Sequence, residues 1–162
     1  MEGAAGLLAW LDASQLARAM RGSIWLYPIV EIVHIVGIAL LVGSVAMFDL
    51  RVLGFARSLP LQALGRYLLP WSVASLALVV PAGVMMFSAH PYDLIGNTAF
   101  RLKLLLIGVA GLNALLFHKG IYRSAAAWDA GMPAPPLAKM QALASLAIWI
   151  AVISCGRLLA YT

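Results

Sequence analysis

Four long apolar stretches organise the chain, at about Ile24–Phe48, Leu68–Ala89, Ala99–His118 and Met140–Ala160. A helix needs about 20 residues, at a rise of about 1.5 Å each, to cross a hydrocarbon layer roughly 30 Å thick. Each stretch meets that length, and a helix satisfies its own backbone hydrogen bonds in lipid. The pattern therefore predicts an all-α fold, a four-helix transmembrane bundle over residues 23–162.

The first 22 residues show a different pattern. Between Ala4 and Met20 the apolar residues gather on one helical face, while Asp12, Gln15 and Arg18 interrupt the sequence. Such a segment is too polar to span a bilayer but suits the interface between headgroups and lipid chains. Residues 1–22 are therefore predicted to be an interfacial amphipathic helix. No basic region precedes a cleavage site, so no cleaved signal peptide is expected.

Proline, glycine and asparagine mark breaks in the apolar pattern. Pro81 followed by Gly83 predicts a kink within the second apolar stretch. Asn97 or Thr98 is expected to cap the third helix. Residues 131–136, with the sequence GMPAPP, are expected to form an irregular loop.

Composition strengthens the membrane assignment. Hydrophobic residues make up 64% of the 162 residues and charged residues only 10%, well outside the usual composition of a soluble domain. Nearly all of the sequence is taken up by the four stretches, which leaves no room for a soluble catalytic domain. Any chemistry is therefore expected within the bundle or at its two ends.

The net charge of +5 is explained better by membrane topology than by nucleic-acid binding, so no nucleic-acid partner is expected. Two loops hold most of the basic residues, and loops rich in Lys and Arg stay on the cytoplasmic side. Both termini are then expected outside, in a multi-pass protein of a bacterial inner membrane. The basic residues of the two loops are Arg51, Arg57, Arg66, Lys119, Arg123 and Lys139.

Four ionisable residues, Glu31, His34, Lys103 and Arg157, interrupt the apolar stretches. Counted from each helix midpoint, they lie roughly 4–9 Å towards the outer side. A charged group within lipid costs about 2.5–3.5 kcal/mol on insertion scales. These residues are therefore expected to pair with one another, or to face a ligand.

Two interpretations follow for these residues. In the first, Glu31 bridges Lys103 and Arg157 in a buried ion-pair cluster, which leaves one positive charge unmatched. In the second, they line an outward-facing pocket for a haem propionate, a quinone carbonyl or a transported carboxylate. Arg157 would then supply a two-pronged contact and Lys103 a point charge.

In the second interpretation His34 is the candidate axial ligand of haem b. The second apolar stretch offers Gly83 for close approach, with Met85, Met86 and His90 as further candidate ligands. His118 is predicted to lie roughly 18 Å from His34 in height, which excludes a shared iron. A mononuclear copper or zinc site at His34, His90 and Glu31 is an alternative.

A second polar cluster is expected at the opposite end. There Asp49 and Arg51 close the first apolar stretch, while His118, Lys119 and Trp128 close the third. Anchoring at the membrane interface is the other explanation for these residues. The one cysteine, Cys155, excludes an intramolecular disulfide and any CxxC motif, and it is expected to be a buried packing residue.

A signature of small, polar and aromatic residues runs along the chain. Its members are His34, Gly37, Gly43 and Ser44, then Asp49, Leu50, Arg51, Leu53 and Gly54, and further along Phe100, Lys103, Asn113, Phe117, His118, Trp149, Gly156, Arg157 and Tyr161. This signature resembles that of an uncharacterised family of small four-helix bacterial inner-membrane proteins. The resemblance covers nearly the whole chain and implies a fold and a location but no activity. A more distant likeness is to copper-resistance and cytochrome b-type membrane bundles.

The leading hypothesis from the sequence is a redox-associated membrane subunit that binds haem b or quinone, with other membrane subunits as possible partners besides lipid. A small transporter or channel for an anionic or protonatable solute is one alternative. A non-catalytic scaffold subunit of a larger complex is another. No catalytic residue is assigned, and enzymatic activity is left open.

Overall fold

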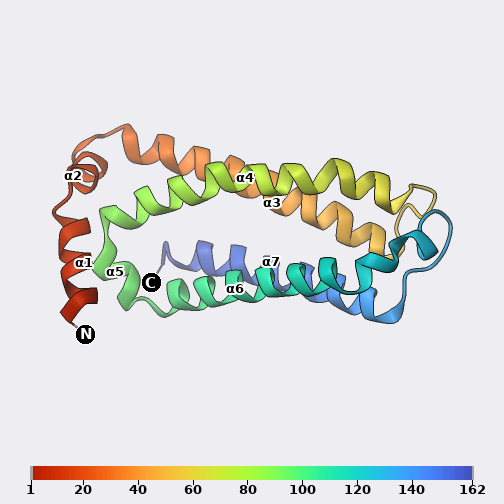
Figure 1. Ribbon diagram of the computed structural model, residues 1–162. Helices are drawn as coiled ribbons and strands as arrows, with labels where there is room; N and C mark the ends of the chain where they lie inside the picture. Colours follow the sequence, from red (N-terminus) through yellow and green to blue (C-terminus); the bar gives the residue numbers. More distant parts are fainter. Residues whose placement is uncertain (1, 162) are drawn as a thin grey trace.

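The structure is a computed structural model, and it describes residues 2–161, with side chains from residue 6 onward. These residues form helices and connecting segments with no strand (Figure 1). In chain order the helices are α1 Glu2–Asp12, α2 Gln15–Gly22, α3 Leu26–Leu53, α4 Leu61–Ala89, α5 Pro91–Gly96, α6 Thr98–Lys119, the 3₁₀ helix η1 Ile121–Trp128 and α7 Pro136–Leu158. The all-α fold class is confirmed.

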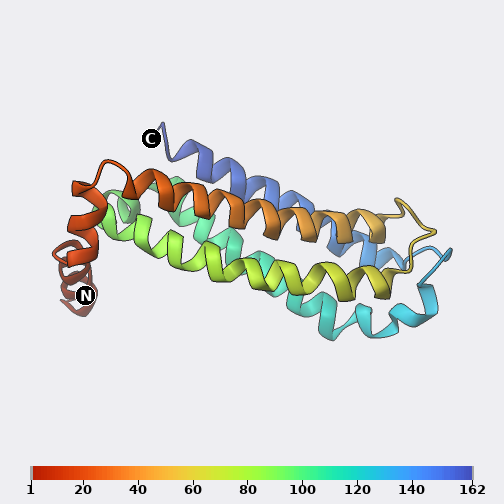
Figure 2. The same ribbon diagram turned by 90° about the horizontal axis from the view of Figure 1, so that it is seen from above.

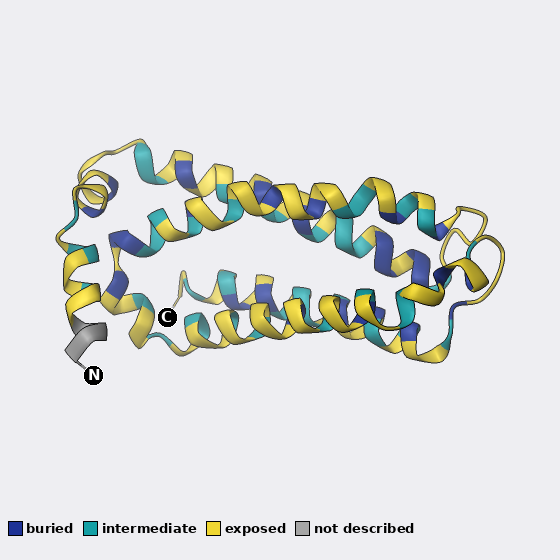
Figure 3. Cartoon of the chain, viewed as in Figure 1, coloured by how far each residue is buried: buried dark blue, intermediate teal, exposed yellow. Residues whose placement is uncertain are grey.

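The helices α3, α4, α6 and α7 are long and apolar enough to cross a membrane. Only 11% to 28% of the most apolar window of each is buried within the protein. Figure 3 shows exposed residues along the outward faces of all four helices. Because such large apolar surfaces require a non-aqueous environment, the chain is a multi-pass membrane protein in contact with the lipid bilayer.

The four long helices pack as two pairs, α3 with α4 and α6 with α7, and α3 joins the pairs by packing on α7 (Figures 1 and 2). Between α3 and α4 the approach is close at Gly37. A Cβ atom there would lie 2.8 Å from the side chain of Val79. Gly37 therefore permits the close packing of α3 on α4.

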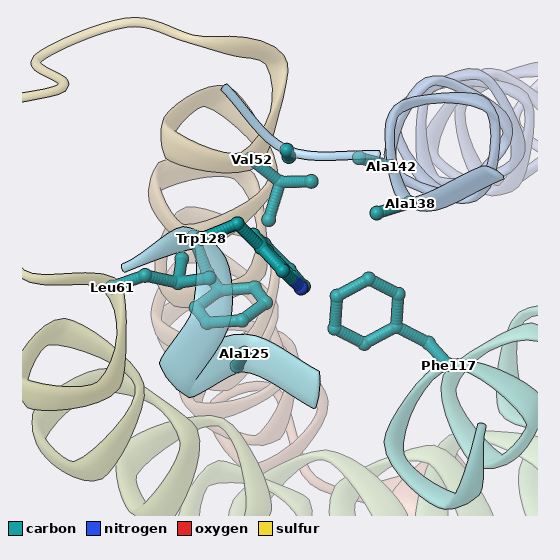
Figure 4. Packing of buried hydrophobic residues seen from close by; sticks show 9 residues of the cluster. Val52, Leu61, Phe117, Ala125, Trp128, Ala138 and Ala142 are labelled. Atoms are coloured by element: carbon teal, nitrogen blue, oxygen red, sulfur yellow. The ribbon is translucent and has the colours of Figure 1, made fainter. Parts of the chain in front are cut away.

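Helix α1 and the C-terminal end of α7 lie at the same end of the bundle, which we call the terminal end (Figure 1). The opposite end, the loop end, carries the 54–60 connection, η1 and the 129–135 connection. A cluster of buried apolar residues fills the loop end (Figure 4). Its members are Phe48, Val52, Leu61, Phe117, Ala125, Trp128, Ala134, Ala138 and Ala142.

Arg51 ties the loops together at this end. It is only 2% exposed, and its guanidinium donates to the backbone carbonyl oxygens of Leu59 at 2.7 Å, Arg57 at 3.2 Å and Asp129 at 2.6 Å. The Asp129 carboxylate in turn accepts from the backbone N–H of Gln62 at 3.0 Å. One guanidinium thus fixes both connections of the loop end.

At the terminal end two helices replace the single interfacial helix that the pattern predicts. Ser14 separates α1 from α2 and caps α2 by accepting from the backbone N–H of Ala17. Arg21 forms an ion pair with Asp12 at 2.8 Å and donates to the carbonyl of Ala89 at 2.9 Å. These contacts hold α1 and α2 across the end of the bundle (Figure 1).

Several helix boundaries differ from the predicted ones. α4 begins at Leu61 rather than Leu68, because the polar residues after Pro60 continue the same helix and Pro70 is accommodated inside it. The expected loop after His90 contains the short helix α5. Asn97 caps α6 as expected, accepting from the backbone N–H groups of Ala99 and Phe100.

Candidate functional site

His34 lies between α3 and α4, with its ring against Gly83. A Cβ atom on Gly83 would lie 3.2 Å from Cε1 of His34, so a larger residue would force the ring to shift. Nδ1 of His34 is 2.9 Å from the backbone oxygen of Val79. The close approach expected at Gly83 is therefore present.

The hydrogen bond to Val79 defines the tautomer of His34. A carbonyl oxygen only accepts, so Nδ1 carries the proton and donates it. In the neutral ring Nε2 then bears the lone pair, and no described residue provides Nε2 with a hydrogen-bond partner. This leaves Nε2 free to accept a proton or to bind a metal.

Glu31 and Lys103 are the two charged groups that act electrostatically on His34. Lys103 is partly buried on α6 beside α7, and its Nζ would lie 3.6 Å from a Cβ atom on Gly156. Glu31 is exposed on α3. Lys103 is thus the cation of the predicted set whose electrostatic field reaches His34.

The predicted ion-pair cluster does not form. Within the part of the chain that the structure describes, an ion pair within 4 Å joins Arg21 to Asp12, Nδ1 of His90 lies 3.8 Å from the Asp93 carboxylate, and no ion pair joins Glu31 to Lys103 or Arg157. Glu31 is exposed and has no ion-pair partner among the described residues. The expectation that Glu31 bridges the two cations was wrong.

Arg157 instead forms its hydrogen bond with Tyr161, four residues further along the chain. It donates to the hydroxyl of Tyr161 at 2.5 Å, and its guanidinium carbon lies 4.9 Å from the centre of that ring. Both residues are exposed at the terminal end. A two-pronged contact from Arg157 to a ligand would require Arg157 to leave Tyr161.

His90 stands apart from His34. It follows Gly83 by seven residues, or about 10 Å along α4, and it pairs with Asp93 at 3.8 Å. Together with Arg21 and Asp12 it lines a shallow, open cleft of about 290 Å³ between α4, α5 and the N-terminal helices.

The described residues contain no group of three His, Cys, Asp or Glu side chains arranged to hold a metal ion. The alternative of copper or zinc at His34, His90 and Glu31 therefore lacks its geometry. Met85 and Met86 pack against the small apolar cluster of Met20, Val30, Ala82 and Ala89. Cys155 is buried, as expected.

The polar residues expected to cluster at the loop end separate into several environments. Arg51 binds backbone carbonyls, as described above. His118 donates from Nδ1 to Ala114 of its own helix and lies among aromatic rings, with its centroid 5.2 Å from that of Tyr122. Trp128 donates to Ser124 at 3.0 Å.

Asp49 faces α7, where sequence reasoning missed its partners. The Asp49 carboxyl group is hydrogen-bonded to Ser145. Gln141 lies one turn before Ser145, and its backbone oxygen accepts from the side chain of Asn113 at 3.0 Å. The signal available was the i, i+4 spacing of Gln141 and Ser145 in an apolar helix, with Asn113 as the polar residue of a facing one.

Comparison with known proteins adds a family but no activity. The model of a family described as "Family of unknown function (DUF6644)" matches residues 8–162. Searches of curated proteins and of solved structures found no match.

Proposed function

We propose that this chain, which belongs to the DUF6644 family of unknown function, is a membrane subunit that binds a redox cofactor, haem b or a quinone, at His34. The observation that carries the proposal is the hydrogen bond from Nδ1 of His34 to Val79, which leaves Nε2 without a described partner. Histidines that bind metals typically donate their other ring N–H to a carbonyl or carboxylate in this way.

The surroundings of His34 support a bound group rather than simple packing. An unpaired ring nitrogen between apolar helices is costly unless a ligand or water uses it. Lys103, with no ion-pair partner among the described residues, provides a positive charge from the facing helix pair. A ligand with oxygen acceptors would use both groups.

Haem b and quinone would use these groups differently. Nε2 of His34 would hold haem b and Lys103 would interact with a propionate, and the haem would supply electron transfer. A quinol would donate its hydroxyl proton to Nε2, and a quinone carbonyl would accept from Lys103. Arg157 joins either arrangement only by releasing Tyr161.

The test is made on the full chain purified with native lipid. If haem is bound, a reduced-minus-oxidised absorbance spectrum shows haem bands that His34→Ala abolishes and His90→Ala retains. If quinone is bound, the spectra of wild type and His34→Ala show no haem bands. The amount of quinone recovered from lipid extracts then falls in His34→Ala but not in His90→Ala. His90→Ala is the matched control because His90 lies at the rim of the bundle.

Wild-type protein with neither cofactor would overturn the proposal. If His34→Ala also leaves the thermal stability unchanged, the scaffold alternative is favoured. Uptake of an anionic solute into vesicles would instead favour a transporter.

A further inference from the structure

Asp49 is a buried carboxyl group near the loop end of α3. It is 7% exposed, and it bonds to the hydroxyl of Ser145 on α7. Its Oδ2 atom is fully buried and has no hydrogen-bond partner. One of the two oxygens of this group therefore lacks the donor that a buried oxygen normally finds.

A second buried acceptor without a donor lies on the same face of α7. Gln141 precedes Ser145 by one helical turn, so the two side chains are neighbours. Oε1 of Gln141 is also fully buried and without a partner. Oδ2 of Asp49 and Oε1 of Gln141 thus both lack a donor. A single hydrogen placed between these two oxygens would satisfy both.

No positive charge compensates Asp49. Among the described residues no cation forms an ion pair with Asp49 within 4 Å. The nearest cation in sequence, Arg51, binds the carbonyls of the loops. On the facing helices His118 bonds to its own helix, Lys119 is exposed, and Lys139 lies in the first turn of α7. An ionised Asp49 would be an unpaired buried charge, which is strongly unfavourable.

We propose that Asp49 is a proton-binding site, held as a neutral carboxylic acid that donates its proton to Oε1 of Gln141. A proton on Oδ2 turns an acceptor into a donor and satisfies both unpartnered atoms with one bond. A metal ion would need several more oxygen ligands. The described residues offer no group of three acidic, His or Cys side chains for one.

This site is independent of the one at His34. Fifteen residues of α3 separate Asp49 from His34, or about 22 Å along the helix axis. The proton is carried by Asp49 and accepted in a hydrogen bond by Gln141. Loss of the proton would leave Asp49 as a carboxylate that keeps only its bond to Ser145.

The test is infrared spectroscopy of the full chain in lipid vesicles at neutral pH. Wild-type protein is expected to show a carboxylic acid C=O band that disappears in Asp49→Asn. Glu31→Gln is the control, because Glu31 is exposed and carries no buried proton in this proposal, and it should keep the band. Identical wild-type and Asp49→Asn spectra in that region would overturn the proposal.

Two further measurements examine the partner and the ligand. In Gln141→Leu the acid loses its acceptor, so the band should shift to higher frequency; an unchanged band would refute Gln141 as the acceptor. Addition of NaCl in place of choline chloride should leave the band intact. Loss of the band on adding Na⁺ would show that a metal cation, rather than a proton, binds Asp49.

Discussion

The three histidines of this chain lie in three different environments that their spacing alone does not distinguish. The sequence offered Gly83 for close approach to a group bound at His34, and in the structure Gly83 makes room for the His34 ring. The acceptor for Nδ1 could not be predicted, because Val79 contributes only its backbone oxygen. Likewise, the direction of Arg157 depends on Tyr161, four residues on, as much as on the charges opposite.

Gly83→Ala tests whether the His34 ring needs the space that Gly83 leaves for it. The added Cβ would lie 3.2 Å from the imidazole, whereas a Cβ on Gly43 would meet nothing within 4 Å. Overpacking costs about 1–3 kcal/mol, so Gly83→Ala should be less stable than Gly43→Ala by about that amount. The free energy of unfolding in bicelles measures it. Equal stabilities would show that the ring adjusts without cost.

Tyr122 gives the loop end a dependence on pH. Burial, and then the negative charge of Asp129, raise the pKa of Tyr122 above its ordinary value of 10.0. The folded protein favours the neutral phenol, so this contribution to stability is complete below pH 10 and is lost as the pH rises through the raised pKa. Above pH 10, wild type should therefore lose more unfolding free energy than Tyr122→Phe. Parallel pH profiles of the two proteins would contradict this.

At the scale of helices, the apolar pattern located all four spans but not all of their ends. α4 extends seven residues before its predicted start at Leu68, because a helix that leaves the hydrocarbon can continue with polar residues such as Gln62 and Arg66. The break at Ser14 was missed because a capping serine inside an amphipathic segment resembles one more polar position. Apolar periodicity reports what is buried in lipid, and it says little about helix ends in water.

Arg51 is expected to be the most sensitive residue of the loop end. Its guanidinium supplies three bonds to carbonyls of two connections, and hydrogen bonds of charged groups contribute about 1.5–3 kcal/mol each. Arg51→Lys should reduce the free energy of unfolding by about 3 kcal/mol, since an ammonium cannot reproduce the fork. The exposed Arg123→Lys is the control, and a similar loss in both variants would refute the role of Arg51.

For the whole molecule, the sequence predicted the fold and the membrane location but not the pairing of charges. Depth along a helix can be counted from the sequence, whereas rotation about the helix axis decides whether residues at one depth meet. Glu31 and Lys103 share a depth and still do not pair. The same limit hid the contact of Asp49 with Ser145, which arises where α3 packs on α7.

The orientation in the membrane is predicted from the basic loops of the loop end. A reporter fused after Thr162 should be active only outside the cytoplasm, and one inserted between Gly131 and Met132 only inside it. The two reporters test opposite ends of the bundle, so each serves as the control for the other. Activity in the reverse pattern would invert the protein and make the terminal end cytoplasmic.

The pairing of α3 with α4 and of α6 with α7 has a consequence for assembly. Each pair joins helices that are consecutive in the chain, so most helix contacts are local in sequence. Local contacts form quickly because little loop entropy is lost. We therefore expect biogenesis as two successive helical hairpins, each entering the bilayer as a unit, with the docking of α3 on α7 as the late step that completes the protein.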